Sequence, residues 1–545
     1  SNSQAERCSQ RAGTMGNLKS KHKGDRGKAH GGEQHAATPP RKGSEAASHM
    51  VRQAVHIHQE DTPTGSAVWK SYIPVTKKPM GEGATCKVYH CRHHETGQDY
   101  AVKKIRLQGL DAHKRGQLMN EIEIMRSLDH PNIIRIHEVF KSHYELCIVM
   151  EYCTGGELFD ELERFRNMIM PEDICRGHVT NMLRSLAYLH NSGIVHRDLK
   201  LENFIFTSDK KDSRVLKMID FGFSRTYLEG GHMTSVVGTS YYIAPEVIKR
   251  KYGKEADMWS MGCIVYMLLT GELPFPGETD QEVLDKVKNL VNKPDVKYGK
   301  AVRHRVRISL HCQDFINACM KVNPKDRPTA LQALEHPWIK NELEKLEDDE
   351  EAAGHMKEVG QSLARFKKFS MFKKVAMVAL SVNMPTEDLT RLKQIFLEFD
   401  KDHTGTITHE EFCKALSSTS LGKSSLDALF DAVDQDHTGY IKYSEFVAAC
   451  LTEKDAMNDQ YVVAAFNALD LDGDGSITRE EMKTLLGDDV DDKALDRLMK
   501  EADFYKDGVI SLAEFKRAMC MDEVPASPIG GLPGGPFAEA AAAPS

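Results

Sequence analysis

The sequence of 545 residues lacks the features of several large protein classes. It contains no apolar run of about eighteen residues, so we expect no membrane-spanning segment. Its twelve cysteines form no Cys-x-x-Cys pair and no regular framework, which indicates reduced thiols in a cytosolic setting. The net charge of −8 provides no overall basic surface for nucleic acid. We therefore expect a cytoplasmic monomer that binds no nucleic acid.

The two ends of the chain are poor in apolar residues, so we expect residues 1–65 and 523–545 to be disordered. The sequence starts with Ser1, yet Met15-Gly16-Asn17-Leu18-Lys19-Ser20 fits the N-myristoylation pattern if Met15 is the natural start. An acylated Gly16 and nearby basic residues would then bind a membrane surface. A chance match inside a polar tail is the alternative. The basic residues are Lys19, Lys21, Lys23, Arg26 and Lys28.

The most informative stretch is His196-Arg197-Asp198-Leu199-Lys200-Leu201-Glu202-Asn203, which Asp220-Phe221-Gly222 follows. These runs resemble the H-R-D-x-x-x-x-N and D-F-G motifs of protein kinases. The resemblance implies that Asp198 accepts the proton of a substrate hydroxyl and that Asn203 and Asp220 hold Mg²⁺. Phosphoryl transfer requires mainly positioning and neutralisation of phosphate charge, which explains this combination of residues.

An ATP-binding pattern precedes the catalytic loop. Gly81 and Gly83 lie in a strand–turn–strand segment ahead of Lys103, where glycines let backbone amides approach phosphates and the lysine pairs with them. The third glycine of the usual kinase loop is Cys86 here. The residues that we expect to hold ATP are Gly81, Gly83, Val88, Ala101, Lys103 and, in the hinge, Glu151 and Cys153.

The resemblance extends to regulatory and substrate positions. Glu121 matches the glutamate that pairs with the lysine of an active kinase, with Glu123 as the alternative. Lys200 and Thr239 are typical of serine/threonine kinases. Two further roles are implied: Arg197 meets an anion of the activation loop, and Arg327 supports Glu246 of the A-P-E motif. The candidate anions are Glu229, Thr234 and Ser235, the last two when phosphorylated, and we expect that modification to tune activity rather than permit it.

Glu157 and Glu202 stand where related kinases bind basic residues upstream of the acceptor. We therefore expect protein substrates with an arginine about three residues before the serine or threonine. The alternative is that both carboxylates are only solvated. The candidate catalytic residues are thus Lys103, Glu121, Asp198, Lys200, Asn203 and Asp220, and the candidate substrate-binding residues are Glu157 and Glu202.

Residues 340–385 change in character from the kinase-like part. Apolar residues recur at three- and four-residue spacing with basic residues between them, which predicts a basic amphipathic helix of the kind that calmodulin-like grooves bind. Ordinary core packing is the alternative. The apolar residues are Leu363, Phe366, Phe369, Phe372, Val375, Ala376 and Ala379, and the basic ones are Arg365, Lys367, Lys368, Lys373 and Lys374.

Four EF-hand loops follow, starting 34, 36 and 33 residues apart, each with oxygen ligands at fixed positions, glycine at position 6 and isoleucine at position 8. The isoleucines, which we expect to pair between loops, are Ile407, Ile441, Ile477 and Ile510. We predict calcium in the first three loops. Tyr505 replaces an acidic ligand in the fourth, so that loop is either a weaker site or purely structural. The candidate ligands are Asp400, Asp402, Thr404, Thr406 and Glu411; Asp434, Asp436, Thr438, Tyr440 and Glu445; Asp470, Asp472, Asp474, Ser476 and Glu481; and Asp503, Asp507, Val509 and Glu514.

This order of segments resembles the calcium-dependent protein kinases of plants and protists, from about Tyr72 to Met521. The resemblance implies an α+β two-lobed kinase fold at residues 66–339, an autoinhibitory junction at 340–385 and an all-α calmodulin-like domain of four EF-hands at 386–522. It also implies transfer of the ATP γ-phosphate to serine or threonine under the control of the chain's own EF-hands, with Mg²⁺ and Ca²⁺ as cofactors.

Three questions stay open at this point. At rest, Arg365, Lys367 and Lys368 would imitate a basic substrate against Glu157 and Glu202, or the junction would leave the kinase lobes unsupported. A calcium-sensing scaffold with an inactive kinase fold is one alternative function. A kinase that also needs separate calmodulin is the other.

Overall fold

The computed structural model describes residues 56–59, 68–82, 86–210, 214–222, 224–226, 233, 238–290, 307–340, 351–417, 423–452, 458–487 and 490–520. The myristoylation pattern, Gly83, Glu229, Thr234 and Ser235 lie outside these ranges. In the described part no helix is long and apolar enough to cross a membrane.

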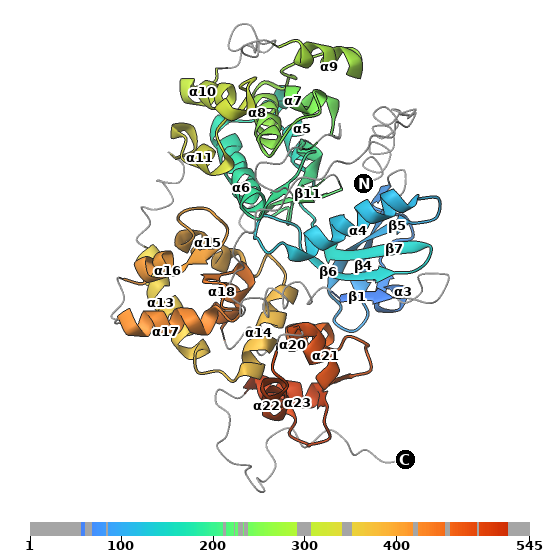
Figure 1. The fold of residues 1–545 in the computed structure, drawn as a ribbon, viewed down its shortest axis with the longest axis vertical. Helices are drawn as coiled ribbons and strands as arrows, with labels where there is room; N and C mark the ends of the chain where they lie inside the picture. The colour runs from blue at the N-terminus through green and yellow to red at the C-terminus, as the bar shows by residue number, and fades with distance from the viewer. Residues whose placement is uncertain are drawn as a thin grey trace, which may run out of the picture.

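A seven-stranded sheet forms the amino-terminal kinase lobe, with strand order β1-β6-β7-β5-β4-β2 and β3 paired with β4. The strands are β1 (His56–Gln59), β2 (Tyr72–Pro74), β3 (Gly81–Glu82), β4 (Cys86–His93), β5 (Asp99–Arg106), β6 (Ile136–Lys141) and β7 (Glu145–Glu151). Helices α3 (Val68–Ser71) and α4 (Ala112–Ser127) complete the lobe. Figure 1 shows it beside the helical lobe.

Strand β1 corrects the expectation of disorder over residues 1–65. It pairs in parallel with β6, and the His58 ring stacks on Phe140 at 4.3 Å between centroids. Four residues of a polar segment are ordered here because the edge of β6 offers backbone partners and an aromatic surface.

The carboxy-terminal kinase lobe is mainly helical and surrounds the buried helix α8. Arg327 forms a two-pronged ion pair with Glu246, at 2.5 and 2.8 Å, inside this lobe. The elements are α5 (Leu158–Glu163), α6 (Glu172–Asn191), β8 (Ile194–Val195), β9 (Phe204–Phe206), β10 (Leu216–Met218), β11 (Arg225–Thr226), α7 (Pro245–Ile248), α8 (Glu255–Thr270), α9 (Asp280–Lys288), α10 (Leu310–Cys319) and α11 (Ala330–Leu334), with 3₁₀ turns η1 (Arg166–Met168), η2 (Leu201–Asn203), η4 (Ser240–Tyr242) and η6 (Pro324–Asp326).

Two helices, not one, form the junction: α13 (Glu351–Phe366) and α14 (Met371–Asn383). The break falls at Ser370, whose hydroxyl accepts a hydrogen bond from the Lys373 amide and so caps α14. The predicted apolar residues are all buried, in one core with the EF-hands. The junction helices thus pack in a hydrophobic core, as one expectation stated. The EF-hands form that core, as the other expectation stated.

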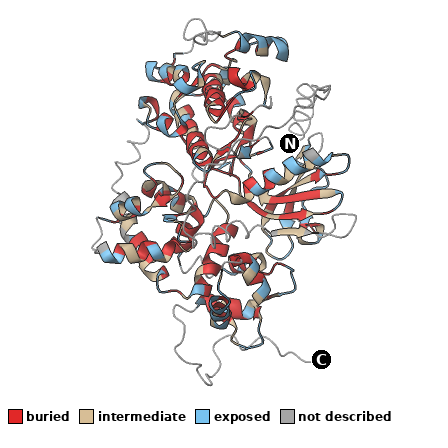
Figure 2. Cartoon of the chain, in the orientation of Figure 1, coloured by how far each residue is buried: buried red, intermediate tan, exposed pale blue. Residues whose placement is uncertain are grey.

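The EF-hand domain consists of two pairs of hands on either side of α14 (Figure 1). Nearly every residue of α14 is buried (Figure 2). Ile407 pairs with Ile441, and Ile477 with Ile510, which confirms the predicted pairing of loops. The elements are α15 (Thr390–Phe399), β12 (Ile407–Thr408), α16 (His409–Ala415), α17 (Lys423–Val433), β13 (Tyr440–Ile441) and α18 (Tyr443–Cys450), then α20 (Asp459–Leu469), β14 (Ser476–Ile477), α21 (Arg479–Leu486), α22 (Asp492–Ala502), β15 (Ile510–Ser511) and α23 (Leu512–Cys520).

The EF-hand domain lies against both kinase lobes (Figure 1). The first pair of hands meets the carboxy-terminal lobe, where Gly405 approaches Tyr188 of α6 so closely that an added Cβ would lie 2.6 Å from the tyrosine ring. The second pair meets the amino-terminal lobe, where the Asn467 amide of α20 donates to Glu95 at 2.7 Å. The predicted fold class, a two-lobed kinase followed by helical EF-hands, is confirmed.

Candidate active site and calcium loops

The buried carboxylate of Asp257 holds the backbone of the catalytic loop in place. Its two oxygens accept the backbone amides of His196 and Arg197 at 3.0 and 2.8 Å, and Arg197 has a positive φ of 70°. Burial alone would raise the pKa of Asp257, but the hydrogen bond from His190 helps to lower it. A stable anion therefore fixes a backbone turn that L-residues rarely adopt.

Asp198 is surrounded by hydrogen-bond donors. One oxygen lies 3.0 Å from Lys200 Nζ, and the other accepts the amide and the hydroxyl of Thr239, each at 2.9 Å. Asn203 donates its side-chain amide to the Asp198 carbonyl at 2.7 Å. Because its NH₂ group is used in this way, Asn203 offers its amide oxygen as the ligand for a divalent metal ion.

Lys103 on β5 lies between two carboxylates. Its Nζ is 3.7 Å from Glu121 on α4 and 3.6 Å from Asp220. Burial opposes the charge of Lys103, but Asp220 and Glu121 outweigh it and raise the pKa of the lysine. Glu123, the alternative partner, pairs with Arg126 at 3.0 Å instead. The structure thus brings together the lysine–glutamate pair that active kinases require.

The phosphate loop and the hinge flank this pair. Gly81 is opposite Val88, Val88 is opposite Lys103, and Ala101 is opposite Met150. The Glu151 side chain is engaged away from a nucleotide: it pairs with Lys217 and accepts the Thr386 hydroxyl, both at 2.7 Å. Glu151 therefore has only its backbone to offer an adenine ring. Cys153 is partly exposed in the same hinge.

The two predicted substrate-binding glutamates differ in their surroundings. The Glu157 backbone at the start of α5 donates to Asp160 at 3.1 Å. Glu202 lies on η2 beside Lys200, and its Oε2 is buried with no hydrogen-bond partner among the described residues. A carboxylate oxygen withdrawn from water in this way suits a cationic ligand, because burial without a partner costs free energy.

Carboxylates converge in each of the first three EF-hand loops. Three ligand atoms lie within 4.8 Å of one another in the groups Asp400, Asp402, Glu411; Asp434, Asp436, Glu445; and Asp470, Asp472, Glu481. Burial and the neighbouring carboxylates raise the pKa of Asp400 to about 8. Such crowding of negative charge fits a hard divalent cation with oxygen ligands, as Ca²⁺ is. The threonines and Ser476 of these loops lie among the same ligands and bond within the loop.

The fourth loop differs from the other three. Its Asp503, Asp507 and Glu514 do not form such a group among the described residues, and Tyr505 is exposed. The glycine amide still bonds to the first aspartate, from Gly508 to Asp503 at 3.1 Å, as in loops 1 to 3. The loop therefore keeps the EF-hand turn with fewer clustered charges.

Lys442 is a residue of loop 2 that the sequence reasoning missed. Its ammonium group forms an ion pair with Asp436, a candidate calcium ligand, and this pair lowers the pKa of Asp436 although burial would raise it. The lysine occupies position 9 of the loop, where a ligand often binds through water. Its charge therefore opposes calcium in this loop.

The pseudosubstrate hypothesis concerns the resting kinase and stays a prediction, but the structure places Arg365 against the EF-hand domain. Its guanidinium donates to the Leu451 carbonyl at 2.8 Å, and Lys367 and Lys368 are exposed. Of these three basic residues, Arg365 therefore contacts the EF-hand domain.

Replacing Lys442 by glutamine should tighten calcium binding to loop 2 by about tenfold, because a positive charge beside the ion is removed. Calcium titration of the full chain by calorimetry measures this change. Lys414→Gln, on the exposed part of α16, controls for net charge, and the gain should vanish in a Glu445→Gln background. An affinity that Lys442→Gln leaves unchanged would contradict this role.

Two family models match the chain: "Protein kinase domain" over residues 75–339 and "EF-hand domain pair" over residues 389–451 and 459–520. "Calcium-dependent protein kinase 5" of Plasmodium falciparum is 33% identical over 454 residues, which cover 82% of this chain and 77% of the relative. "Calcium-dependent protein kinase 21" of Arabidopsis thaliana is 32% identical, with coverage of 80% and 81%. "Calcium-dependent protein kinase 13" of Oryza sativa subsp. japonica is 36% identical, with coverage of 81% and 79%.

These matches agree with the described part of the site, which includes the Lys103–Glu121 pair and the clustered carboxylates of EF-hand loops 1 to 3. They favour an enzyme over a scaffold with an inactive kinase fold. ATP, a divalent metal ion and Ca²⁺ are the cofactors that the two domains imply. The chain belongs to the calcium-dependent protein kinases and is a calcium-activated serine/threonine protein kinase.

Proposed function

We propose that the EF-hand domain activates this kinase by contacting both of its lobes and the hinge between them, a set of contacts that we call the brace. The junction then supports the arrangement of the lobes and does not only block the kinase. One observation carries the proposal. The guanidinium of Arg135, beside the hinge, donates to the carbonyls of Ser381 and Val382 at 3.2 and 2.8 Å, at the end of α14. The helix that fills the EF-hand core thus ends on the kinase.

The hinge itself takes part in this contact. Thr386, just after α14, donates to Glu151, whose backbone begins the hinge. Burial would raise the pKa of Glu151, but the ion pair with Lys217 lowers it. The side chain therefore accepts the hydrogen bond as a charged carboxylate. The position of the EF-hand domain is thereby linked to the segment that joins the lobes.

Contacts on each side of the hinge complete the brace. The Ser444 amide, in calcium loop 2, donates to Asp129 of the kinase at 2.9 Å, and Gly405, in loop 1, packs on Tyr188. Asn467 reaches Glu95 on the other lobe. Loops 1 and 2 lie in the interface with the kinase. A change in the conformation of these loops on calcium binding therefore changes the contacts of the interface directly. The same arrangement coexists with the Lys103–Glu121 pair.

In the proposed reaction the substrate hydroxyl oxygen attacks the γ-phosphorus of ATP, the bond to the β-phosphate oxygen breaks, and Asp198 accepts the hydroxyl proton. Lys200 and Thr239 hold the Asp198 carboxylate in place. Lys103 would contact the α- and β-phosphates, and Asn203 and Asp220 would hold Mg²⁺. Bound Mg²⁺ neutralises charge on the phosphate oxygens.

Substrates of this kinase carry basic residues upstream of the acceptor in our proposal. The support is the buried Glu202 oxygen, which has no hydrogen-bond partner in the described part of the chain, and the position of Glu157 at the start of α5. The protein acts as a cytoplasmic monomer, and an acylated Gly16 with its basic neighbours would hold it at membranes. Phosphorylation of the activation loop tunes its rate, and separate calmodulin is not required.

Arg135→Gln should raise the calcium concentration for half-maximal activity about threefold. Loss of a charged hydrogen bond costs about 1.5–3 kcal/mol, which is shared among three calcium ions. Peptide phosphorylation over a calcium titration measures this shift. Arg92→Gln removes the same charge from an exposed ion pair with Asp99 and should leave the midpoint unchanged. Equal midpoints for Arg135→Gln and the wild type would refute the brace.

Glu202→Gln should raise the KM for a serine peptide with arginine at minus three by about tenfold, with a small change in kcat, because one charge pair of about 1.4 kcal/mol is lost. The matched peptide with alanine at minus three should show little change. The exposed Glu163→Gln is the control variant. If both peptides lose the same factor, Glu202 does not read the basic residue.

A further inference from the structure

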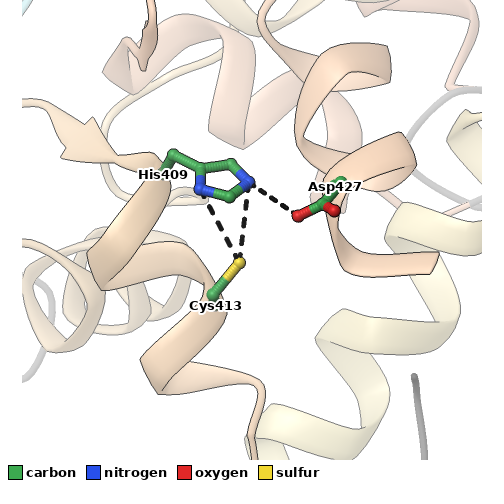
Figure 3. A group of neighbouring side chains, drawn as sticks. All are labelled: His409, Cys413 and Asp427. Carbon is green, nitrogen blue, oxygen red and sulfur yellow. Dashed lines mark hydrogen bonds and ion pairs between the residues drawn. The ribbon is translucent and has the colours of Figure 1, made fainter. Parts of the chain in front are cut away.

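A histidine, a cysteine and an aspartate meet on the surface of the first pair of EF-hands, outside the calcium loops' own ligand groups (Figure 3). His409 and Cys413 lie on α16 and Asp427 on α17. We propose that this His409–Cys413–Asp427 cluster is a binding site for one Zn²⁺ ion, which fastens α16 to α17.

The positions follow from local structure. Residues four apart on a helix share a face, so His409 and Cys413 point to the same side of α16. Phe430 of α17 fixes the imidazole, which contacts it edge-on at 4.9 Å between centroids. Phe412 packs on the same Phe430 ring at 5.5 Å. The two helices are thus held together by aromatic contacts that also set the histidine ring.

The distances suit a tetrahedral ion with a small adjustment. His409 Nε2 lies 3.0 Å from an Asp427 oxygen and 3.7 Å from Cys413 Sγ, and all three ligand atoms lie within 4.8 Å of one another. Zinc bonds of about 2.0–2.3 Å place tetrahedral ligand atoms roughly 3.3–3.8 Å apart. Nε2 faces both partners, as a shared metal ion requires, and Nδ1 lies farther from the sulfur, at 4.0 Å (Figure 3).

The chemistry of the ligands selects the metal. Imidazole nitrogen and thiolate sulfur are preferred by Zn²⁺, whereas Ca²⁺ and Mg²⁺ take oxygen ligands. Three protein ligands leave the fourth position to water. The thiol proton of Cys413 passes to solvent when the ion binds. His409 and Asp427 are 45% and 46% exposed, so the ion reaches them without opening the core.

The place of the cluster connects it with calcium. His409 is two residues from Glu411, the last ligand of loop 1, on the same helix. An ion that fixes α16 therefore acts on an element that calcium also uses, and any coupling between the two ions is reciprocal.

Zinc titration of the full chain in saturating calcium, against a chromophoric zinc chelator, tests the site. Saturating calcium occupies the oxygen-rich loops first. Wild type and Cys520→Ser, which removes an exposed thiol of the same domain, should bind one zinc ion that His409→Gln, Cys413→Ser and Asp427→Asn weaken. Each loss should exceed the roughly 10- to 100-fold that outer-shell changes cause.

Zinc sites elsewhere in the chain would persist equally in all of these proteins. Matching circular dichroism spectra and calcium stoichiometries show that the variants are folded. A Cys413→Ser titration that superimposes on the wild-type titration overturns the proposal.

Cobalt provides a second and independent readout. Co²⁺ in the wild-type site should give a thiolate-to-cobalt charge-transfer band and the visible bands of four-coordination, both retained in Cys520→Ser and lost in Cys413→Ser. A six-coordinate spectrum, or a thiolate band that survives Cys413→Ser, would show that the cluster does not bind the metal.

Discussion

The end of helix α14 is the point on which the two halves of this protein depend. The last carbonyls of any helix lack partners within it, and they carry partial negative charge. Here a guanidinium from the kinase, that of Arg135, satisfies carbonyls of Ser381 and Val382. The same helix fills the core of the EF-hand domain with apolar side chains. The carbonyls at the end of α14 bind a cationic side chain, and the kinase places one beside its hinge. This contact defines the position of the regulatory domain.

Calcium can control this contact because the loops are electrostatically unfavourable without a cation. Burial and neighbouring carboxylates raise the pKa of Asp400 to about 8 and that of Asp434 to about 6. Shifting a two-state equilibrium from 1:99 to 99:1 takes about 5.5 kcal/mol, or about 2 kcal/mol for each of three ions. Loops 1 and 2 contact the kinase through Gly405 and Ser444. Calcium binding to these loops therefore acts directly on residues of the interface. The Lys442–Asp436 pair would make the second of these loops the harder one to fill.

Much of the site could be predicted from the sequence because its chemistry fixes the spacing of residues. The pairing of Lys103 with Glu121, the isoleucine bridges and the carboxylate groups of loops 1 to 3 are of this kind. Strand β1 was not predicted because it has only four residues and is stabilised by the edge of a strand that is distant in the sequence. Such a strand leaves almost no local sequence pattern. The break at Ser370 did have a signal, since serine before an apolar run is a helix cap. The contact of Arg135 with α14 had none, because it joins parts of the chain that are far apart in sequence.

Phosphate transfer from ATP-Mg²⁺ to a serine peptide with arginine at minus three, titrated from chelator to micromolar calcium, tests the central claim most directly. The wild type and a Glu411→Gln, Glu445→Gln, Glu481→Gln variant should be compared. The account predicts a steep calcium-dependent rise in the wild type and a flat response in the triple variant. Undiminished calcium activation of the triple variant, or full wild-type activity in chelator, would contradict it.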